Sequence, residues 1–342
     1  MALTDRVADA VAAIRAPDVV VAVTRHGART VLSGGTAPPP PGGRHALRYE
    51  LGSLSKTFTV LLLAALAHDG MLGTDDRLTD RLPRLPRHAS PHPTAHRITL
   101  RHLATHTSGL PRLPRELLPA GLFQPYANGY RGYGTDRLLH SFARTRPRPP
   151  GTRWHYSNFG LALLGCALAR ATGTAFPALL THRVLAPLGL TGTTLEPGTT
   201  GTDAMGHRAD GRTPVPAGPM GAFAPAAAVR ATPGDLLTYL EAHLAPGTTP
   251  LAGAVRAVQV PQLRRGAGRP HTHTLTWFRH PAPGGPLLFH LGATFGQQAF
   301  LGFHPASGTG VAAVATRRGR ACRLTETAYE LLYALGGDAA GG

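Results

Sequence analysis

Lysine is nearly absent from this sequence of 342 residues. Lys56 is the one lysine, and the other 34 of the 35 Lys and Arg residues are arginines. Against 18 Asp and Glu, the formal net charge is +17, which by itself favours nucleic acid or another anionic partner. The arginines are scattered from Arg6 to Arg323, however, and no nucleic-acid-binding motif accompanies them. We therefore interpret them as mostly solvated side chains and expect no nucleic-acid partner.

The sequence also lacks the features of a disulfide-rich or membrane protein. Two cysteines, Cys166 and Cys322, cannot form a disulfide framework. The longest apolar stretch, around Val60 to Ala67, is too short to span a bilayer. No charged segment followed by an apolar one stands at the N-terminus, so no signal peptide is visible. We expect a cytoplasmic protein that makes no membrane contact.

The residue pattern predicts an α/β (α+β) fold whose sheet is built from both ends of the chain. Hydrophobic residues make up 42% of the chain and charged residues 15%, enough for a substantial core. Helical spacing is found near each terminus, at Leu3–Ile14 and Leu324–Leu335. Short β-branched or apolar runs predict strands beside them: Asp18–Thr24, Arg29–Leu32, Leu275–Phe278, Leu287–His290, Gln298–Phe303 and Val311–Thr316.

The segment between these ends reads as mainly helical. We therefore expect residues 1–70 and 245–342 to form one domain, an antiparallel sheet flanked by the terminal helices. Residues 71–244 would form a large, mainly helical insertion, with an active site in the cleft between the two units.

Ser53 and Lys56 form a Ser-x-x-Lys pattern at the start of a strongly apolar helix, Leu54–Leu66. Residues i and i+3 share one helical face, so the hydroxyl and the amine can meet. An amine against an apolar wall is desolvated, which lowers its pKa toward that of a base. The helix N-terminus adds backbone N–H groups suited to a developing oxyanion.

Ser-x-x-Lys alone is a weak pattern, since a surface Ser and Lys meet at this spacing by chance. Here the composition favours a functional role for Lys56, because arginine replaces lysine at every other position. A guanidinium cannot lose its proton at accessible pH, so a requirement for a neutral amine would preserve one lysine.

A Tyr-x-Asn pattern occurs twice, at Tyr126 and at Tyr156. Tyr126 lies in a Gly-rich loop with no helix directly after it. Tyr156 follows the Pro150-Gly151-Thr152 turn and abuts an apolar helix that begins at Phe159. This anchoring suits a phenol and an amide held toward a cleft, so we assign Tyr156 and Asn158 to the site.

His290-Leu291-Gly292-Ala293 directly follows a predicted strand. The edge of a strand beside the nucleophile can donate a backbone N–H, and Gly292 would permit the close approach of a substrate.

With these pieces in this order, the chain resembles the serine β-lactamase and penicillin-binding superfamily. Within it, the chain is most similar to the branch of class C β-lactamases, D-Ala-D-Ala carboxypeptidases and esterases, with the corresponding β-lactamase/transpeptidase-like fold. The resemblance spans most of the chain and includes three segments: Leu51–Thr59, Ile98–Leu110 and Pro150–Asn158.

The resemblance implies a role for each matching residue. Ser53 would attack a carbonyl and become acylated, while Lys56 and Tyr156 would move the proton and activate the deacylating nucleophile. Asn158 would hydrogen-bond the substrate or Lys56. The backbone N–H groups of Ser53 and Ala293 would form the oxyanion hole. No cofactor is implied, and the partner would be a small-molecule acyl substrate.

One departure from the family pattern changes the expected substrate. The Lys-Thr-Gly strand motif of the family stands here as His290-Leu291-Gly292, and histidine is a weaker, pH-dependent anchor for a carboxylate. Efficient β-lactam hydrolysis is therefore not expected, and the missing leader points the same way.

Three functions stay open at this point. The chain could hydrolyse an ester or amide through an acyl-Ser53 intermediate, or pass the acyl group to an alcohol or amine as an acyltransferase of natural-product biosynthesis. It could also be a non-catalytic sensor that is acylated slowly. The shape of the cleft decides between hydrolysis and acyl transfer, and the sequence does not reveal that shape. No metal site is expected, because His102 and His106 share a helical face without a third ligand. The sequence does not show the oligomeric state.

Overall fold

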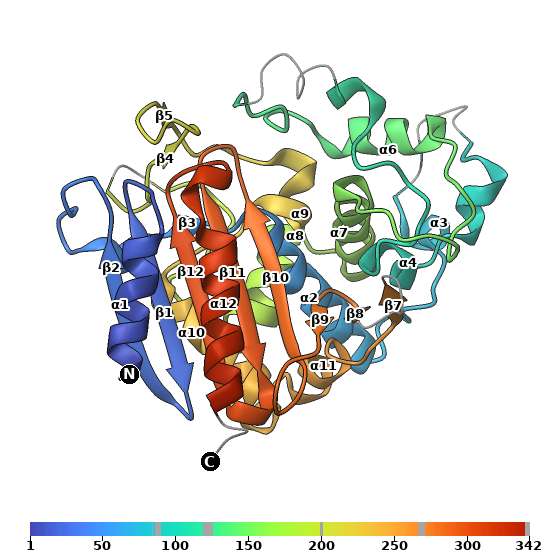
Figure 1. Cartoon of the computed structure of the whole chain (residues 1–342). Coiled ribbons are helices and arrows are strands. Elements are labelled where there is room, and N and C mark those ends of the chain that lie inside the picture. The colour runs from blue at the N-terminus through green and yellow to red at the C-terminus, as the bar shows by residue number, and fades with distance from the viewer. Residues whose placement is uncertain (84, 86–89, 119–125, 199–200, 266–270, 339–342) are drawn as a thin grey trace.

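The computed structural model describes residues 1–83, 85, 90–118, 126–198, 201–265 and 271–338. Its centre is an eight-stranded antiparallel sheet in the order β2-β1-β12-β11-β10-β9-β8-β7 (Figure 1). The strands are β1 (Val19–Arg25), β2 (Ala28–Gly34), β7 (Leu263–Arg265), β8 (His271–His273), β9 (Phe278–His280), β10 (Leu287–Ala293), β11 (Gln298–His304) and β12 (Thr309–Ala315). The expected sheet from both chain ends is confirmed.

Two helices from the chain ends cover one face of this sheet. Figure 1 shows α1 (Leu3–Ala13) and α12 (Leu324–Gly337) side by side against the strands. Alternate residues of β1 point to opposite faces: Val19, Val21 and Val23 pack under these two helices, whereas Val20 and Ala22 join the larger core on the other side. Burial on both faces explains why β1 reads as a continuous apolar run rather than an alternating one.

The other face packs against helices from the middle of the chain. The remaining α-helices in the described residues are α2 (Ser55–His68), α3 (Leu78–Arg81), α4 (Leu100–Ala104), α6 (Thr135–Arg144), α7 (Asn158–Thr172), α8 (Phe176–Leu180), α9 (Ala224–Ala227), α10 (Pro233–Leu244) and α11 (Ala252–Ala257). Among these helices, α2 and α7 contribute the most buried apolar residues to this core. Among the described residues no single helix is long and apolar enough to cross a membrane, and one sharply bent pair, α7 with residues 176–185, meets that test by length and composition alone.

Four short strands lie outside the main sheet: β3 (Tyr49–Glu50) pairs with β6 (Arg230–Ala231), and β4 (Gly206–His207) pairs with β5 (Pro214–Val215). The β3–β6 pair connects the segment before Ser53 to the helical region. The division of the chain into two domains at residues 70 and 244 stays a prediction. Helix α10, which that division assigns to the helical unit, packs on β1 and β12 of the sheet.

Two strand predictions on the C-terminal side were wrong in detail. The strand expected at Leu275–Phe278 begins only at Phe278, because Thr274 and Trp277 close a turn in which the Thr274 hydroxyl accepts the Trp277 N–H. The sequence predicted no strand at His271–His273, yet this segment forms β8 and buries His273. Neither strand has the apolar alternation that marks the longer ones.

Candidate active site

Ser53 and Lys56 lie where a 3₁₀ turn, Gly52–Leu54, runs directly into α2. Ser53 is half-buried, and Lys56 is 1% exposed in the core. The Lys56 Nζ donates to the Ala226 carbonyl at 2.8 Å. Burial lowers the pKa of the Lys56 amine well below its ordinary value, and the charge of Arg112 lowers it further. Burial therefore favours the neutral form of the amine, and its role as a base stays a prediction.

Tyr156 reaches the same point from the other side of the site. Its hydroxyl donates to Ser53 Oγ at 2.5 Å, and Lys56 Nζ lies 4.9 Å from the centre of its ring. Burial raises the pKa of the Tyr156 phenol to about 12, against the opposing effects of the Ser53 hydrogen bond and the Arg112 charge. The phenol therefore keeps its proton at neutral pH.

The other Tyr-x-Asn copy lies elsewhere. The Tyr126 hydroxyl accepts the backbone N–H of Ala209 at 3.3 Å, and Arg208 stacks on its ring. Only Tyr156 of the two tyrosines contacts Ser53 in the described structure.

The backbone after Tyr156 is fixed by a helix cap and by a histidine. Ser157 caps α7, with its hydroxyl accepting the Gly160 N–H at 2.9 Å and donating to the Pro111 carbonyl at 2.7 Å. The Ser157 N–H in turn donates to His106 Nδ1 at 3.1 Å. His106 has a φ of +58°, an uncommon conformation for a residue with a side chain. This contact was not visible in the sequence, because 50 residues separate the two segments.

Asn158 is the first residue of α7 and is 8% exposed. Its Nδ2 donates to the Tyr130 hydroxyl at 3.2 Å, while its Oδ1 is buried and has no hydrogen-bond partner within the described residues. Because a buried polar atom without a partner costs free energy, this oxygen is suited to an incoming donor.

Two glycines bring β10 against the nucleophile. A Cβ at Gly292 would lie 1.9 Å from the Leu51 carbonyl oxygen, and one at Gly52 would lie 2.4 Å from the Ala293 oxygen. Gly52 also has a φ of +52°. Gly292 is therefore needed for the contact of backbone with backbone, and its part in the approach of a substrate stays a prediction. The contact sets Ala293 beside the Ser53 turn.

His290 is buried, and its Nδ1–H donates to the Leu291 carbonyl at 2.9 Å. Burial lowers the pKa of His290 to about 3. The imidazole is therefore neutral at physiological pH, with Nε2 as a hydrogen-bond acceptor. The expectation of a pH-dependent cationic anchor at His290 does not fit this environment.

A buried polar network joins the two sides of the site. Glu50 accepts from Arg230 Nη2 at 2.8 Å and from the Thr294 hydroxyl at 2.7 Å. The Glu50 N–H donates to the Gln297 side chain at 3.0 Å. The network therefore ties β3, three residues before Ser53, to the turn that follows Ala293. It was missed because a charged residue in a sequence is by default read as solvated.

Ser53, Tyr156, His290, Gly292 and Ala293 line one cavity of about 710 Å³. Four arginines also line it, whereas Glu326 is its one acidic residue. The sequence analysis missed these arginines: Arg112, Arg318, Arg320 and Arg323. A signal for Arg112 existed, since it stands two residues after the Ile98–Leu110 motif.

A family model described as Beta-lactamase matches residues 3–335. The chain belongs to the beta-lactamase family. It is 26% identical to a beta-lactamase of Pseudomonas fluorescens over 322 residues, with 84% of each chain covered. It is 30% identical to penicillin-binding protein 4 of Amycolatopsis lactamdurans, with 84% of this chain and 77% of that one covered.

Solved structures agree with this assignment. The crystal structure of a class C beta lactamase from Rhodobacter sphaeroides aligns with a TM-score of 0.79 and 26% identity, covering 97% of this chain and 99% of the other. The mixed fold with an antiparallel sheet is therefore that of the beta-lactamase family, whose members are serine hydrolases. The resemblance drawn from the three sequence segments is confirmed.

Proposed function

We propose that this member of the beta-lactamase family is a serine hydrolase that cleaves an ester or amide of a small-molecule or peptide-like substrate through an acyl-enzyme on Ser53. One observation carries the proposal: the Tyr156 hydroxyl donates to Ser53 Oγ at 2.5 Å beside a buried amine whose pKa is lowered. A hydroxyl is a weak nucleophile until a nearby base takes its proton.

In the proposed acylation, Ser53 Oγ attacks the carbonyl carbon as the neutral amine of Lys56 accepts the hydroxyl proton. The carbonyl oxygen becomes an oxyanion and is stabilised by the backbone N–H groups of Ser53 and Ala293. Collapse breaks the bond to the leaving group, which takes a proton from Tyr156, and Lys56 then reprotonates the phenolate. In deacylation, water attacks the acyl carbon by the reverse proton route.

The charges of the cavity favour an anionic substrate. The lining of the cavity contains four arginines and one glutamate. Because His290 is neutral, a carboxylate of the substrate would be bound by those arginines. Asn158 does not line this cavity, and its buried Oδ1, which has no partner among the described residues, would accept an N–H only from a substrate that reaches beyond the lining.

The experiment combines labelling with burst kinetics. We expect a serine-reactive phosphonate to label the native chain once and Ser53→Ala not at all, as measured by intact mass. A chromogenic ester should give a burst followed by steady turnover. Labelling that persists in Ser53→Ala would sink the assignment. A burst without turnover would indicate a sensor, and diversion of the product by an added alcohol would indicate an acyltransferase.

A further inference from the structure

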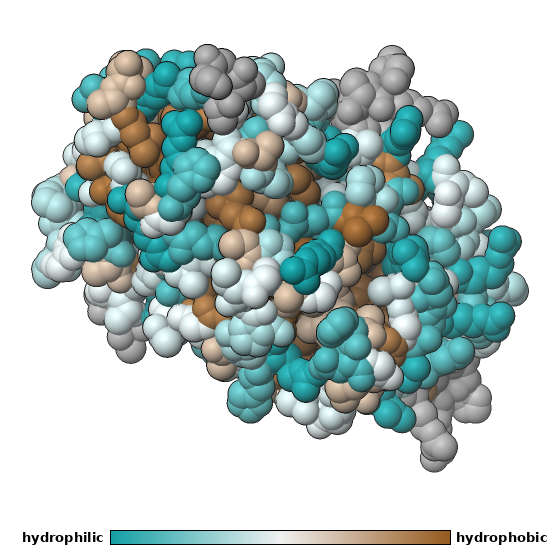
Figure 2. Space-filling model, turned by 90° about the horizontal axis from the view of Figure 1, so that it is seen from below, coloured by the Kyte–Doolittle hydropathy of each residue, from teal (hydrophilic) through white to brown (hydrophobic). Residues whose placement is uncertain are grey.

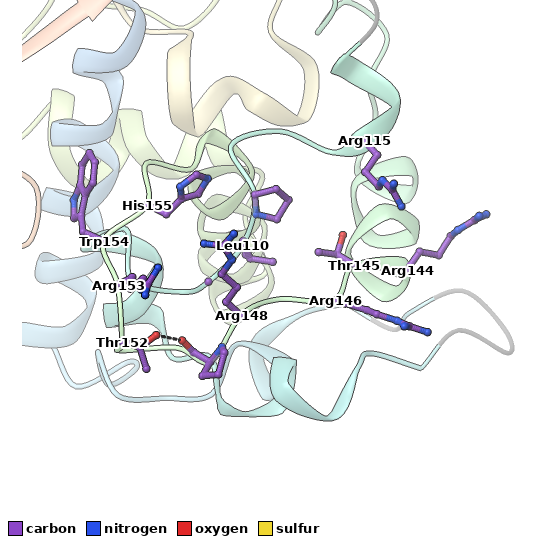
Figure 3. Close-up of a pocket in the computed structure, with 13 residues that line it drawn as sticks. Leu110, Arg115, Arg144, Thr145, Arg146, Arg148, Thr152, Arg153, Trp154 and His155 are labelled. Carbon is purple, nitrogen blue, oxygen red and sulfur yellow. Dashed lines mark hydrogen bonds between the residues drawn. The ribbon is translucent and has the colours of Figure 1, made fainter.

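A second cavity, of about 860 Å³, lies beside the active-site cavity. Its lining includes five arginines and His155 but no carboxylate (Figure 3). Figure 3 shows Arg148 and Arg153 on one side of the space, and Arg115, Arg144 and Arg146 on the other. A volume of this size lies within the range of small-molecule sites, about 300–1,000 Å³.

No carboxylate compensates these five arginines. All 18 acidic residues of the chain lie in the described ranges, and within those ranges no ion pair involves any of the five. Glu116, the sequence neighbour of Arg115, lines an adjacent cavity together with Arg115 and Arg144, but its carboxylate accepts from the Tyr133 and Ser141 hydroxyls and forms no ion pair with either arginine. Positive charge therefore gathers in a concave site, where a field is focused more strongly than on a convex surface.

The backbone that presents the arginines is held in place. Four of the five come from the segment 144–153, which contains three prolines, at 147, 149 and 150. The Arg148 N–H donates to the Gly109 carbonyl at 3.0 Å, and the Gly151 N–H to the Thr107 carbonyl at 2.8 Å. Gly109 has a φ of +74°, and a Cβ there would lie 2.1 Å from the Arg148 oxygen. Binding an anion would therefore order side chains but not this backbone.

Trp154 lines both cavities, and Tyr156 follows it by two residues. A ligand in the second cavity would therefore lie against the segment that carries the phenol of the active site.

We propose that the cavity lined by Arg115, Arg144, Arg146, Arg148 and Arg153 binds a multiply charged phosphate compound. Guanidinium groups hold phosphate oxygens through paired N–H donors, and several of them together suit a ligand with more than one phosphate. Two kinds of compound carry this chemistry: a substrate of Ser53 with a phosphate-bearing part, and a separate phosphate compound. We call them the two sources of the ligand. The first source rests on the proposed function, whereas the site itself does not.

The test is calorimetric titration with inorganic tripolyphosphate. We expect the native chain to bind the probe and Arg148→Gln/Arg153→Gln to bind it at least about tenfold more weakly. The matched control is Arg212→Gln/Arg256→Gln, which removes the same charge from two exposed arginines that line neither cavity. We expect it to bind within about twofold of the native chain. Thermal unfolding of each variant confirms that it is folded.

Three results would overturn the site: no binding by the native chain, an equal loss in both variant pairs, or a loss confined to Arg318→Gln/Arg320→Gln. The second result would mean attraction by net charge alone, and the third would place the probe in the Ser53 cavity.

The source follows from steady-state kinetics with a neutral ester and a phosphate-bearing ester. A rise in KM confined to the phosphate-bearing ester in Arg148→Gln/Arg153→Gln assigns the site to the substrate. An unchanged KM for both esters, with tripolyphosphate binding lost, assigns it to a separate compound. Absence of all ester turnover would refute the proposed function and leave the calorimetric result standing.

Discussion

At the scale of single residues, the site depends on an amine that burial keeps neutral and a phenol that burial keeps protonated. Lys56 and Tyr156 both experience desolvation, yet the effect has opposite consequences for charge because one is a base and the other an acid. At the same pH, the amine of Lys56 can therefore accept a proton and the phenol of Tyr156 can donate one.

Lys56→Arg tests whether the neutral amine matters. Because a guanidinium stays charged, we expect kcat/KM for an ester to fall at least about a hundredfold, the usual range for loss of a general base. Lys56→Met, which removes the amine and keeps an unbranched side chain, should be equally inactive. Activity of Lys56→Arg within a few-fold of the native chain would show that no neutral amine is needed, and near-ultraviolet circular dichroism checks the fold of both variants.

Tyr156→Phe tests the choice between the two Tyr-x-Asn copies. It removes the hydroxyl that donates to Ser53 Oγ, so we expect kcat to fall about a hundredfold or more. Tyr126→Phe, which deletes the same atom where it meets only the Ala209 N–H, should change kcat less than about twofold. The reverse ranking would mean that the phenol of the site was misassigned.

At the scale of elements, the site exists because β10 and the start of α2 pack backbone against backbone. The ion pair between Glu50 in β3 and Arg230 in β6 also stabilises this junction. The two proposed oxyanion donors, the N–H groups of Ser53 and Ala293, therefore belong to two elements whose separation is set by glycines and by a buried ion pair.

Arg230→Met tests that ion pair. Removing one partner leaves Glu50 buried without its cation, so we expect the free energy of unfolding to fall by about 3–5 kcal/mol in urea denaturation. Arg230→Met/Glu50→Gln should recover part of this loss, because the uncompensated charge is gone. For comparison, Asp75→Asn breaks an ion pair whose carboxylate side chain is 72% exposed, and it should cost less than about 1 kcal/mol. Equal costs at the two sites would refute the special role of the buried pair.

The sequence allowed the local part of this site to be predicted but not its long-range contacts. Helical spacing predicted Ser53 and Lys56 within one turn of the start of α2, and a turn followed by an apolar helix distinguished Tyr156 from Tyr126. By contrast, the contact of Gly292 with Leu51 depends on how β10 meets α2, about 240 residues apart in the chain. The strands of the long apolar runs were found, whereas β7 and β8 were missed because their residues are polar.

At the scale of the whole molecule, two buried histidines tie stability to pH. Burial lowers the pKa of His243 to about 4 and of His290 to about 3. In the unfolded chain both titrate near the ordinary value of about 6.5. Below that value the unfolded state binds more protons than the folded state, so stability falls as the pH drops.

We therefore expect the free energy of unfolding to fall between pH 7 and pH 5 by roughly 2 kcal/mol for each of these histidines. His243→Leu should lose correspondingly less over the same interval, since it removes one of the two groups. Urea denaturation at the two pH values measures the difference. An equal loss in the variant and the native chain would show that His243 does not stay neutral in the fold.

The surface mixes hydrophobic and hydrophilic residues. On the face seen from below, hydrophobic residues lie in patches separated by hydrophilic ones (Figure 2). The arginines thus do more than cover a surface: nine of them line the two cavities described above.

The position of β1 between β2 and β12 has a consequence for synthesis on the ribosome. Its inner neighbour is β12, with Val19 opposite Ala315, so that partner is translated nearly 300 residues later. At about 5–20 residues per second, roughly 15–60 s pass before the two strands can pair. Throughout that time the nascent chain presents an unpaired apolar edge, which other chains can bind. We therefore expect shielding of this N-terminal hairpin until the end of translation to raise the yield of folded protein.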